Sequence, residues 1–322
     1  MFDDSLAHNR ILHDILTYAR QGIVCVIFDV DDIETGEHSV ECWLDSQARN
    51  IQVEWNLIFE EFFRMSSVRK MGVVVRLCPD VKVNDFTGSS CAIRLDSILE
   101  FLHKPKKIIL ENSDGDRKFL LSISNRNLRD KLVKLHAQGS LSFEHCGGID
   151  GVATKLTNDF GPELGSAVKC WVLIDSDSFE PGVVSEAAQR VIDICDATGI
   201  NYLCLKRRAI ENYIPNGALQ RFADANGDKA KDTFLALSSL DTIQRNHYHM
   251  ADGFANKTCK DSGLYDALDD KIGKPLRKGF GSNIKHVYPD NPKDLQTFHE
   301  EFGQIPDEFT EPLKYISEMI RG

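Results

Sequence analysis

Residues 106–111 read KKIILE and residues 169–177 read KCWVLIDSD, and these two stretches decide the fold. Each is an apolar run of strand length that ends directly on carboxylates. A third run, YLCL at residues 202–205, leads into the charged segment KRRAIENY. Helix-like segments separate the three runs, and alternating strands and helices predict a parallel sheet with helices on its faces. We therefore expect an α/β fold built on a mostly parallel, Rossmann-like sheet.

The acidic residues after these runs are Glu111, Asp175 and Asp177, with Asp116 at the head of the next expected helix. In such sheets the ligand site lies beyond the carboxyl ends of the strands. Carboxylates gathered there repel one another unless a cation or a proton lies among them, and oxygen ligands suit Mg²⁺ or Mn²⁺. A single strand ending in Asp is often a plain turn. Two such motifs in one alternating unit favour a divalent metal site.

Composition excludes several classes of protein. The net charge of −11 argues against a broad basic surface, but residues 101–215 carry 15 basic and 15 acidic residues, whereas residues 1–100 carry 9 and 17. No apolar run approaches the roughly 20 residues that span a bilayer. The start, MFDDSLAHNR, does not resemble a secretory signal, so we expect a cytoplasmic protein. Nine cysteines without a C-x-x-C pair argue against zinc.

The chain divides into three expected parts. Residues 1–104 combine helical and strand patterns and predict an α+β region, with half-buried strands at 38–44 and 50–56. Pro105 lies in a lysine-rich join and marks a boundary. Residues 105–215 carry the strand–helix alternation. Residues 216–322 show mainly helical patterns.

Further candidate residues follow the expected strands. The glycine pair after the strand at 140–145 opens a helix, where backbone can approach an anion, although a plain turn has the same pattern. Basic side chains after the last strand and in a later basic run could contact phosphate, or could be solvated surface charges. The candidate phosphate contacts are Gly147, Gly148, Lys206, Arg207, Arg208 and Lys278.

The central part resembles a Toprim domain, the fold shared by topoisomerases, bacterial primases and the overcoming-lysogenization-defect (OLD) nucleases. Its hallmarks are a glutamate after the first strand, matched by Glu111, and an Asp-x-Asp after a later strand, matched by Asp175 and Asp177. The OLD-like branch also has an aspartate soon after the glutamate, a glycine pair and an R-x-I/E-N-Y segment. Asp116, the GG pair and residues 208–213 match these.

The match has departures. Asn112 stands where the family usually has glycine, and the turn to Asp116 is one residue longer than usual, so Asp114 could take its place. OLD proteins usually carry an ATPase domain, but no G-x-x-x-x-G-K-[ST] motif occurs in this sequence. The resemblance covers about 110 residues of the chain.

The resemblance implies metal-dependent hydrolysis of phosphodiester bonds in DNA or RNA by two Mg²⁺ or Mn²⁺ ions. Asp175 would bridge the ions, and Asp177, Glu211, Glu111 and Asp116 would complete the ligands. Glu111 could also act as a general acid or base. The implied partners are nucleic acid and a separate ATPase, in a setting such as bacterial anti-phage defence, with no membrane.

Two other functions remain open from the sequence. A catalytically silent Toprim scaffold could bind a partner ATPase or nucleic acid without cutting. Phe28-Asp29-Val30-Asp31 also resembles the opening motif of haloacid-dehalogenase phosphatases, which would place the chemistry at Asp29 and Asp31.

Overall fold

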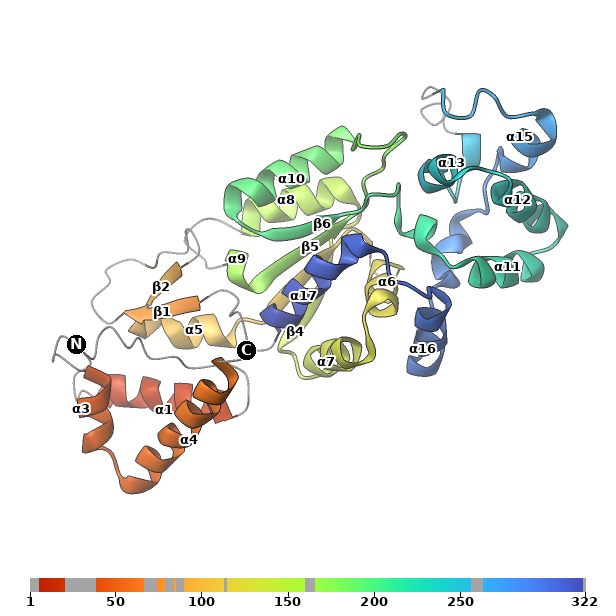
Figure 1. Cartoon of the computed structure of the whole chain (residues 1–322). Helices are drawn as coiled ribbons and strands as arrows, with labels where there is room; N and C mark the ends of the chain where they lie inside the picture. Colours follow the sequence, from red (N-terminus) through yellow and green to blue (C-terminus); the bar gives the residue numbers. More distant parts are fainter. Residues whose placement is uncertain are drawn as a thin grey trace. The chain divides into compact units, whose positions relative to one another are not determined.

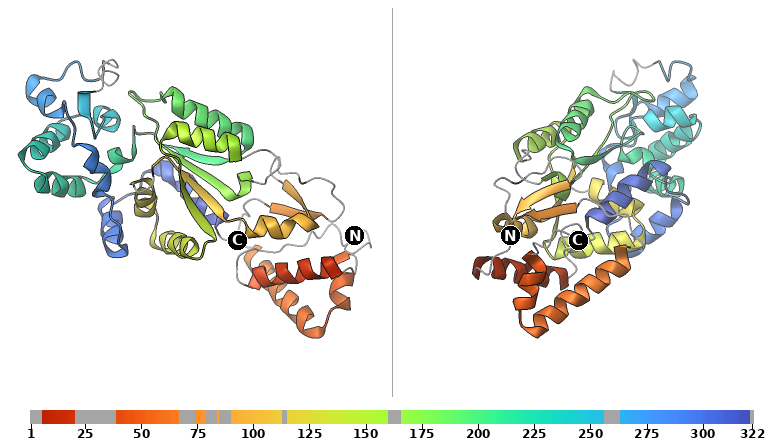
Figure 2. Two further views of the ribbon diagram at one scale, coloured as in Figure 1. Left: turned by 180° about the vertical axis from the view of Figure 1, so that it is seen from behind. Right: turned by 60° about the vertical axis from the view of Figure 1, so that its left-hand side comes forward.

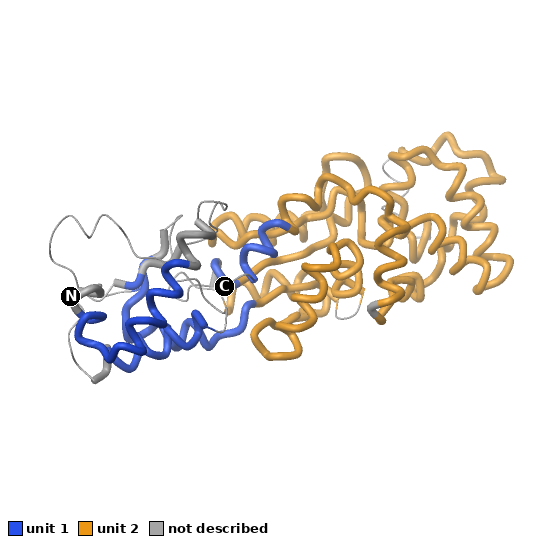
Figure 3. The backbone as a smooth tube through the Cα atoms, turned by 60° about the horizontal axis from the view of Figure 1, so that its bottom comes forward, with its two compact units in different colours: residues 1–106, 161–169, 314–322 blue, residues 107–160, 170–313 orange. Residues whose placement is uncertain are grey.

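The computed structural model describes residues 6–20, 39–66, 74–78, 84, 90–112, 115–159, 166–255 and 263–320. The chain forms two compact units (Figure 3). Unit 1 contains Met1–Lys106, Gly161–Lys169 and Lys314–Gly322, and unit 2 contains Lys107–Phe160 and Cys170–Leu313. The three-part division of the chain, with boundaries at residues 104 and 215, stays a prediction.

Unit 2 is built on a four-stranded parallel sheet, which confirms the predicted α/β class. The strand order is β4-β3-β5-β6. The strands are β3 (Lys106–Leu110), β4 (Leu141–His145), β5 (Cys170–Ile174) and β6 (Asn201–Cys204). Ile108 pairs with Trp171, and Val172 pairs with Tyr202. All five residues of β5 are buried, as expected for a central strand covered on both faces.

The order of the strands fixes which helices cover which face. The chain runs from β3 outward to β4, then crosses back over β3 to β5 and continues to β6. Right-handed crossovers therefore place the helices after β3 on one face and those after β4 and β5 on the other. The helices are α6 (Gly115–Ile123), α7 (Arg126–Ala137), α8 (Ile149–Asp159) and α10 (Glu186–Thr198). Figures 1 and 2 show α8 with α10 on one face and α6 with α7 on the other.

This topology creates a switch point between β3 and β5, because the connections leaving these two neighbours run in opposite directions. A crevice opens beyond the carboxyl ends of strands at such a point, and ligands of doubly wound sheets bind there. Glu111 directly follows β3 and Asp175 directly follows β5. The fold therefore places the two predicted motifs on the two sides of the switch point.

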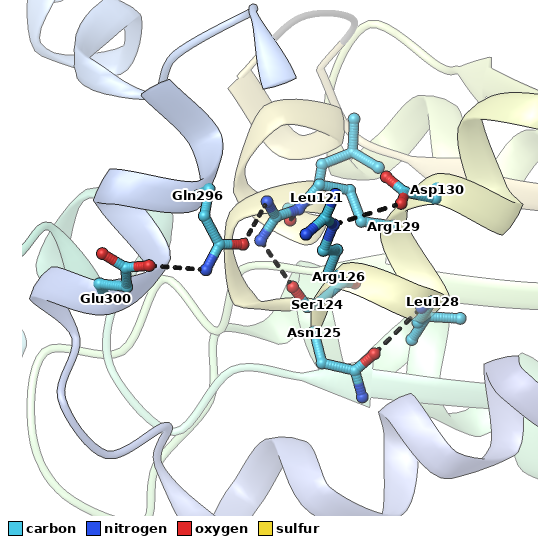
Figure 4. A network of polar contacts seen from close by, with 9 residues as sticks. All are labelled: Leu121, Ser124, Asn125, Arg126, Leu128, Arg129, Asp130, Gln296 and Glu300. Carbon is cyan, nitrogen blue, oxygen red and sulfur yellow. Dashed lines mark hydrogen bonds and ion pairs between the residues drawn. The ribbon is translucent and has the colours of Figure 1, made fainter. Parts of the chain in front are cut away.

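Helix α6, which begins next to Glu111, is held firmly at its far end (Figure 4). The buried Arg129 of α7 donates from Nε to Leu121 O and from Nη2 to Ser124 O, at 2.9 Å each. Arg129 Nη1 also donates to Gln296 Oε1 at 3.4 Å. A helix leaves its last carbonyls without partners, and these contacts satisfy them. The anchoring fixes the helix whose first turn carries Asp116.

The described residues after β6 in unit 2 form helices and turns. The 3₁₀ helices are η2 (Ile210–Tyr213), η3 (Gly253–Ala255), η4 (Ser282–Val287) and η5 (Asp307–Phe309). The α-helices are α11 (Asn216–Ala225), α12 (Asp228–Ser238), α13 (Thr242–His247), α15 (Asp270–Leu276), α16 (Pro292–Glu301) and α17 (Thr310–Met319), the last of which ends in unit 1. Capping side chains start several of them: Asp241, Asp269 and Asn291 accept hydrogen bonds from the first turns of α13, α15 and α16.

Unit 1 has a small apolar core around two tryptophans. Trp43 and Trp55 are buried, with ring centroids 6.0 Å apart in an edge-to-face arrangement. Its helices are α1 (Leu6–Arg20), α3 (Ser39–Ser46), α4 (Arg49–Ser66), α5 (Ile98–His103) and α9 (Ser166–Lys169), with the 3₁₀ helix η1 (Leu95–Ser97). Strands β1 (Val74–Cys78) and β2 (Ser90–Arg94) pair in parallel.

The strands predicted at 38–44 and 50–56 are wrong, because residues 39–44 lie in α3 and residues 50–56 lie in α4; residue 38 lies outside the described residues. Apolar and polar residues alternate over a few positions here, but Ile51, Trp55 and Ile58 recur at helical spacing and face the core. Residues 93 and 94 end β2 and lead into the short helices η1 and α5. No described helix has the length and apolarity needed to cross a bilayer.

Candidate metal centre

Five acidic side chains come together beyond the carboxyl ends of β3, β5 and β6. We call Glu111, Asp116, Asp175, Asp177 and Glu211 the carboxylate cluster. Glu111 and Asp116 are only 6% and 4% exposed. The charges of Asp116, Asp177 and Glu211 all act on Glu111, and those of Glu111, Glu211, Asp116 and Asp177 all act on Asp175. The structure thus brings together every acidic residue predicted as a ligand; Asp114 lies outside the described residues.

Burial, more than any neighbouring charge, perturbs the cluster. Burial, and to a smaller extent the nearby carboxylates, raise the pKa of Glu111 to about 8 and the pKa of Asp116 to about 7. The pKa of Asp175 is raised well above its ordinary value, and that of Glu211 is also raised, for the same reasons. Carboxyl groups in this state hold protons near neutral pH or require compensating positive charge.

Backbone amides orient three members of the cluster. Asp175 N donates to Glu111 Oε1 at 2.5 Å, so the β3 carboxylate is tied to the end of β5. Asn112 N donates to Asp116 Oδ2 at 2.8 Å, and Ile210 N donates to Asp175 Oδ1 at 3.1 Å. These hydrogen bonds stabilise the charged form of each carboxylate without supplying a counter-charge.

Along the segment Asp175–Ser178, the two aspartates belong to the carboxylate cluster and the two serines between and after them are buried. Ser176 and Ser178 are buried, and Ser176 Oγ donates to Arg207 O at 2.9 Å. Asp177 has φ 49° and is the single non-glycine with positive φ among the described residues. Its N–H donates to Arg208 O at 2.9 Å, which holds this uncommon conformation. Backbone strain of this kind is typical of functional sites.

The Glu211–Asn212–Tyr213 segment divides its side chains among three tasks. Glu211 belongs to the carboxylate cluster. The buried Asn212 accepts from Ala209 N and donates to Arg245 O and Tyr248 O, at 2.9 to 3.1 Å. Tyr213 is buried and donates to Glu308 at 2.8 Å. Asn212 and Tyr213 thus fix the turn that carries Glu211 into the carboxylate cluster.

Lys285, which no sequence motif marks as a site residue, contributes positive charge to the cluster. It lies in η4 and lowers the pKa of both Asp116 and Glu211 against the effect of burial. A Cβ placed on Gly115 would lie 3.7 Å from Lys285 Cβ and 3.3 Å from Ile210 Cδ1, so the absent side chain lets these segments approach. Lys285 was visible only as part of a basic run, since 169 residues separate it from Asp116.

The predicted phosphate contacts differ in availability. Lys206 and Lys278 are exposed, Arg207 is half-buried with its guanidinium carbon 4.4 Å from the centre of the Tyr213 ring, and Arg208 is only 4% exposed. Arg208 packs over the Phe179 ring at 4.6 Å. No contact in the described part of the chain links Lys278 to the cluster.

The two predicted glycines lie beside Glu111. Gly147 and Gly148 have φ of 73° and 113°, conformations that favour glycine. Gly148 N donates to Glu111 O at 3.0 Å, so this amide already has a partner. The pair therefore forms the turn from β4 into α8 against the end of β3. Contact with a substrate phosphate stays a prediction for both glycines.

The donor chemistry of the cluster fits a hard divalent cation, because all five candidate ligands are carboxylates. However, no group of three or more His, Cys, Asp or Glu side chains among the described residues already has the arrangement of a metal site. Several carboxylate oxygens instead accept backbone N–H groups. Ligand oxygens would have to turn toward a shared ion.

Comparisons with protein-family models, with curated proteins and with solved structures gave no significant match. Asp29 and Asp31, the candidates for a haloacid-dehalogenase site, lie outside the described residues.

Proposed function

We propose that this chain is a metal-dependent nuclease of the Toprim type, similar to the OLD-like branch but without its own P-loop motif. One observation carries the proposal: acidic residues following β3, β5 and β6 meet at the switch point of a parallel sheet, and four of them have raised pKa values. Excess negative charge at the ligand-binding edge of such a sheet favours a cationic cofactor.

The residues that would hold Mg²⁺ or Mn²⁺ are Glu111, Asp116, Asp175, Asp177 and Glu211. Two such ions would supply positive charge for the phosphodiester and a more acidic water. Asp175 is the candidate bridging ligand, since it lies at the end of the central strand and all four other members act on its pKa.

The protein's own groups would bind and orient the substrate. Lys285 can neutralise a phosphate oxygen, because it already lies close enough to influence Asp116 and Glu211. Lys206 and Arg207, at the end of β6, can contact neighbouring phosphates. Glu111, with a pKa of about 8, can hold or release a proton near neutral pH, as general acid–base catalysis requires.

The resemblance also supports a setting for the proposal. A Toprim nuclease without a P-loop motif would depend on a separate ATPase for any nucleotide-driven step. The acidic residues 1–100 suit a protein partner better than nucleic acid. We include a role in bacterial anti-phage defence in the proposal on the same resemblance.

A nuclease panel tests the proposal directly. Plasmid DNA, single-stranded DNA and RNA would each be incubated with Mg²⁺, with Mn²⁺ and with EDTA. We expect cleavage of at least one substrate that EDTA abolishes and that Glu111→Gln and Asp175→Asn each reduce on the order of a thousandfold. Asp193→Asn, an exposed carboxylate on α10, is the matched control and should keep wild-type activity. Cleavage that persists in EDTA, or full activity in both cluster variants, would contradict the metal assignment.

A further inference from the structure

The loop after β6 holds both aspartates of the Asp175–Asp177 motif. Asp177 N donates to Arg208 O at 2.9 Å, and Ile210 N donates to Asp175 Oδ1 at 3.1 Å. Ser176 Oγ donates to Arg207 O in the same loop. The backbone of residues 206–212, which we call the 206–212 loop, therefore sets the positions of these two carboxylates and also carries Glu211.

A carboxylate far along the chain fastens the start of this loop. Glu308 Oε2 accepts from Lys206 N at 2.9 Å, and Glu308 Oε1 accepts from the Tyr213 hydroxyl at 2.8 Å. The Tyr213 oxygen in turn accepts from Arg207 N at 2.9 Å. Two consecutive backbone amides thus depend on Glu308, one directly and one through Tyr213.

Apolar packing holds both Tyr213 and Glu308, the two side chains in this series of hydrogen bonds. The Tyr213 ring lies 5.6 Å from Phe119 and 5.1 Å from Phe309, between ring centres, and all three residues are buried. Phe309 is the neighbour of Glu308, so the same packing holds the Glu308 backbone. Burial and the nearby Glu308 charge raise the pKa of Tyr213, and its hydroxyl remains a donor at working pH.

We infer that Glu308 is a positioning residue for the carboxylate cluster, acting through Lys206 N and Tyr213 on the 206–212 loop. Without Glu308 the Tyr213 hydroxyl and the Lys206 amide lose their acceptor, and the loop that supports Asp175, Asp177 and Glu211 loosens. The inference rests on the proposed metal site for its functional consequence. The part of the inference that concerns structure, the tethering of Asp177 by Glu308, does not depend on the proposed metal site.

The first test measures metal binding without any activity assay. Thermal unfolding of the full chain would be followed against Mg²⁺ and Mn²⁺ concentration for wild type, Glu308→Ala, Glu308→Gln and Tyr213→Phe. We expect Glu308→Ala and Tyr213→Phe to raise the apparent metal midpoint at least about 10-fold, as loss of a group that orients metal ligands does. Glu308→Gln keeps an acceptor for Lys206 N and should fall between wild type and Glu308→Ala. A double variant of Glu308→Ala with Tyr213→Phe should shift the metal midpoint by less than the sum of the two single shifts, because both substitutions break the same series of hydrogen bonds.

Tyr248→Phe provides the matched control. It removes another buried tyrosine hydroxyl, which donates to Leu276 O at 2.7 Å, and should lower stability without moving the metal midpoint. If Glu308→Ala only lowers stability and keeps the wild-type midpoint, the positioning role is wrong.

Hydrogen exchange separates this inference from the proposed function. In metal-free protein, peptides spanning Asp177 should exchange faster in Glu308→Ala than in wild type or Tyr248→Phe, because the amide of Asp177 depends on Arg208 O. A wild type that shows no response to either metal would refute the proposed metal site, and hydrogen exchange would then decide the tethering alone. Unchanged exchange at Asp177 in Glu308→Ala would overturn it.

Discussion

Two groups of charged side chains lie in unit 2, and they differ in how their charges are balanced. The Lys155 cluster, on the α8 side of the sheet, contains Lys107, Glu144, Lys155 and Asp159. Lys155 Nζ lies 2.9 Å from Glu144 Oε2 and 2.8 Å from Asp159 Oδ2, and Lys107 Nζ lies 3.3 Å from Glu144 Oε1. Two positive charges thus meet two negative charges.

The pKa shifts of the two clusters run in opposite directions. Burial raises the pKa of Glu144, but hydrogen bonds and charges from Lys155 and Lys107 outweigh burial and leave that pKa lowered. In the carboxylate cluster, burial and like charges act together, and backbone hydrogen bonds and the charge of Lys285 oppose them only in part at Asp116 and Glu211. A balanced cluster needs nothing further to be stable. The unbalanced cluster is stable only with bound protons or a bound cation.

The largest expected effect is the loss of metal-dependent stabilisation in Asp175→Asn. Asparagine can still accept from Ile210 N, so the change removes charge with little change of shape. For wild type we expect a gain of about 2.7 kcal/mol at a metal concentration 100-fold above Kd, and for Asp175→Asn almost none. Without metal at pH 8 the variant should be more stable than wild type, because asparagine avoids the cost of burying Asp175 either as a charge or with a bound proton. Urea unfolding with and without Mn²⁺ measures both quantities, and an equal metal gain in both proteins would contradict the assignment.

The next effect is the pH dependence of the metal-free protein. Folding raises the pKa of Glu111 from 4.5 to about 8 and that of Asp116 from 3.8 to about 7. Between these values the folded state binds more protons than the unfolded chain, so stability should fall as pH rises from about 4 to about 8.

Protons and cations would compete for the same oxygens, and the gain in stability from Mn²⁺ should therefore be larger at pH 8 than at pH 6. Urea midpoints in EDTA across this range measure the slope. Glu111→Gln lacks one of the titrating groups and should show a shallower slope than wild type. A slope of the opposite sign would show that folding does not raise the pKa values of these buried carboxyl groups.

Lys155→Met should have a smaller effect, on stability alone. It leaves Glu144 with Lys107 as its remaining cation in a half-buried position, and we expect a loss of about 1–3 kcal/mol. Lys134→Met, on the exposed end of α7, is the control for the loss of a lysine. Because the Lys155 cluster is not part of the proposed site, the metal midpoint should stay at the wild-type value. A shift of that midpoint would mean that the two clusters are coupled.

Local pattern was sufficient to predict the strands that carry Glu111 and Asp175, since continuous apolar runs ending in charge leave few alternatives. It failed at residues 38–56, where a few alternating residues outweighed the helical recurrence of Ile51, Trp55 and Ile58. Lys285 and Glu308 could not be assigned from sequence, because their effects depend on contacts with residues roughly a hundred or more positions away. The positive φ of Asp177 likewise depends on the tertiary partner Arg208.

The smallest expected effect concerns the exposed pair of Arg190 and Asp150, which joins α10 to α8. Arg190 Nη2 lies 2.5 Å from Asp150 Oδ1, a shorter distance than any in the Lys155 cluster, but the two side chains are 62% and 80% exposed. Solvent screens such a pair, so Arg190→Gln should cost no more than about 0.5 kcal/mol in urea unfolding. If distance set the strength of these pairs, Arg190→Gln would cost as much as Lys155→Met. That outcome would show that burial does not explain why the Lys155 cluster is stable and the carboxylate cluster is not. A small loss would support burial as the factor that sets the strength of these pairs and the cost of the unpaired charges at the ends of β3 and β5.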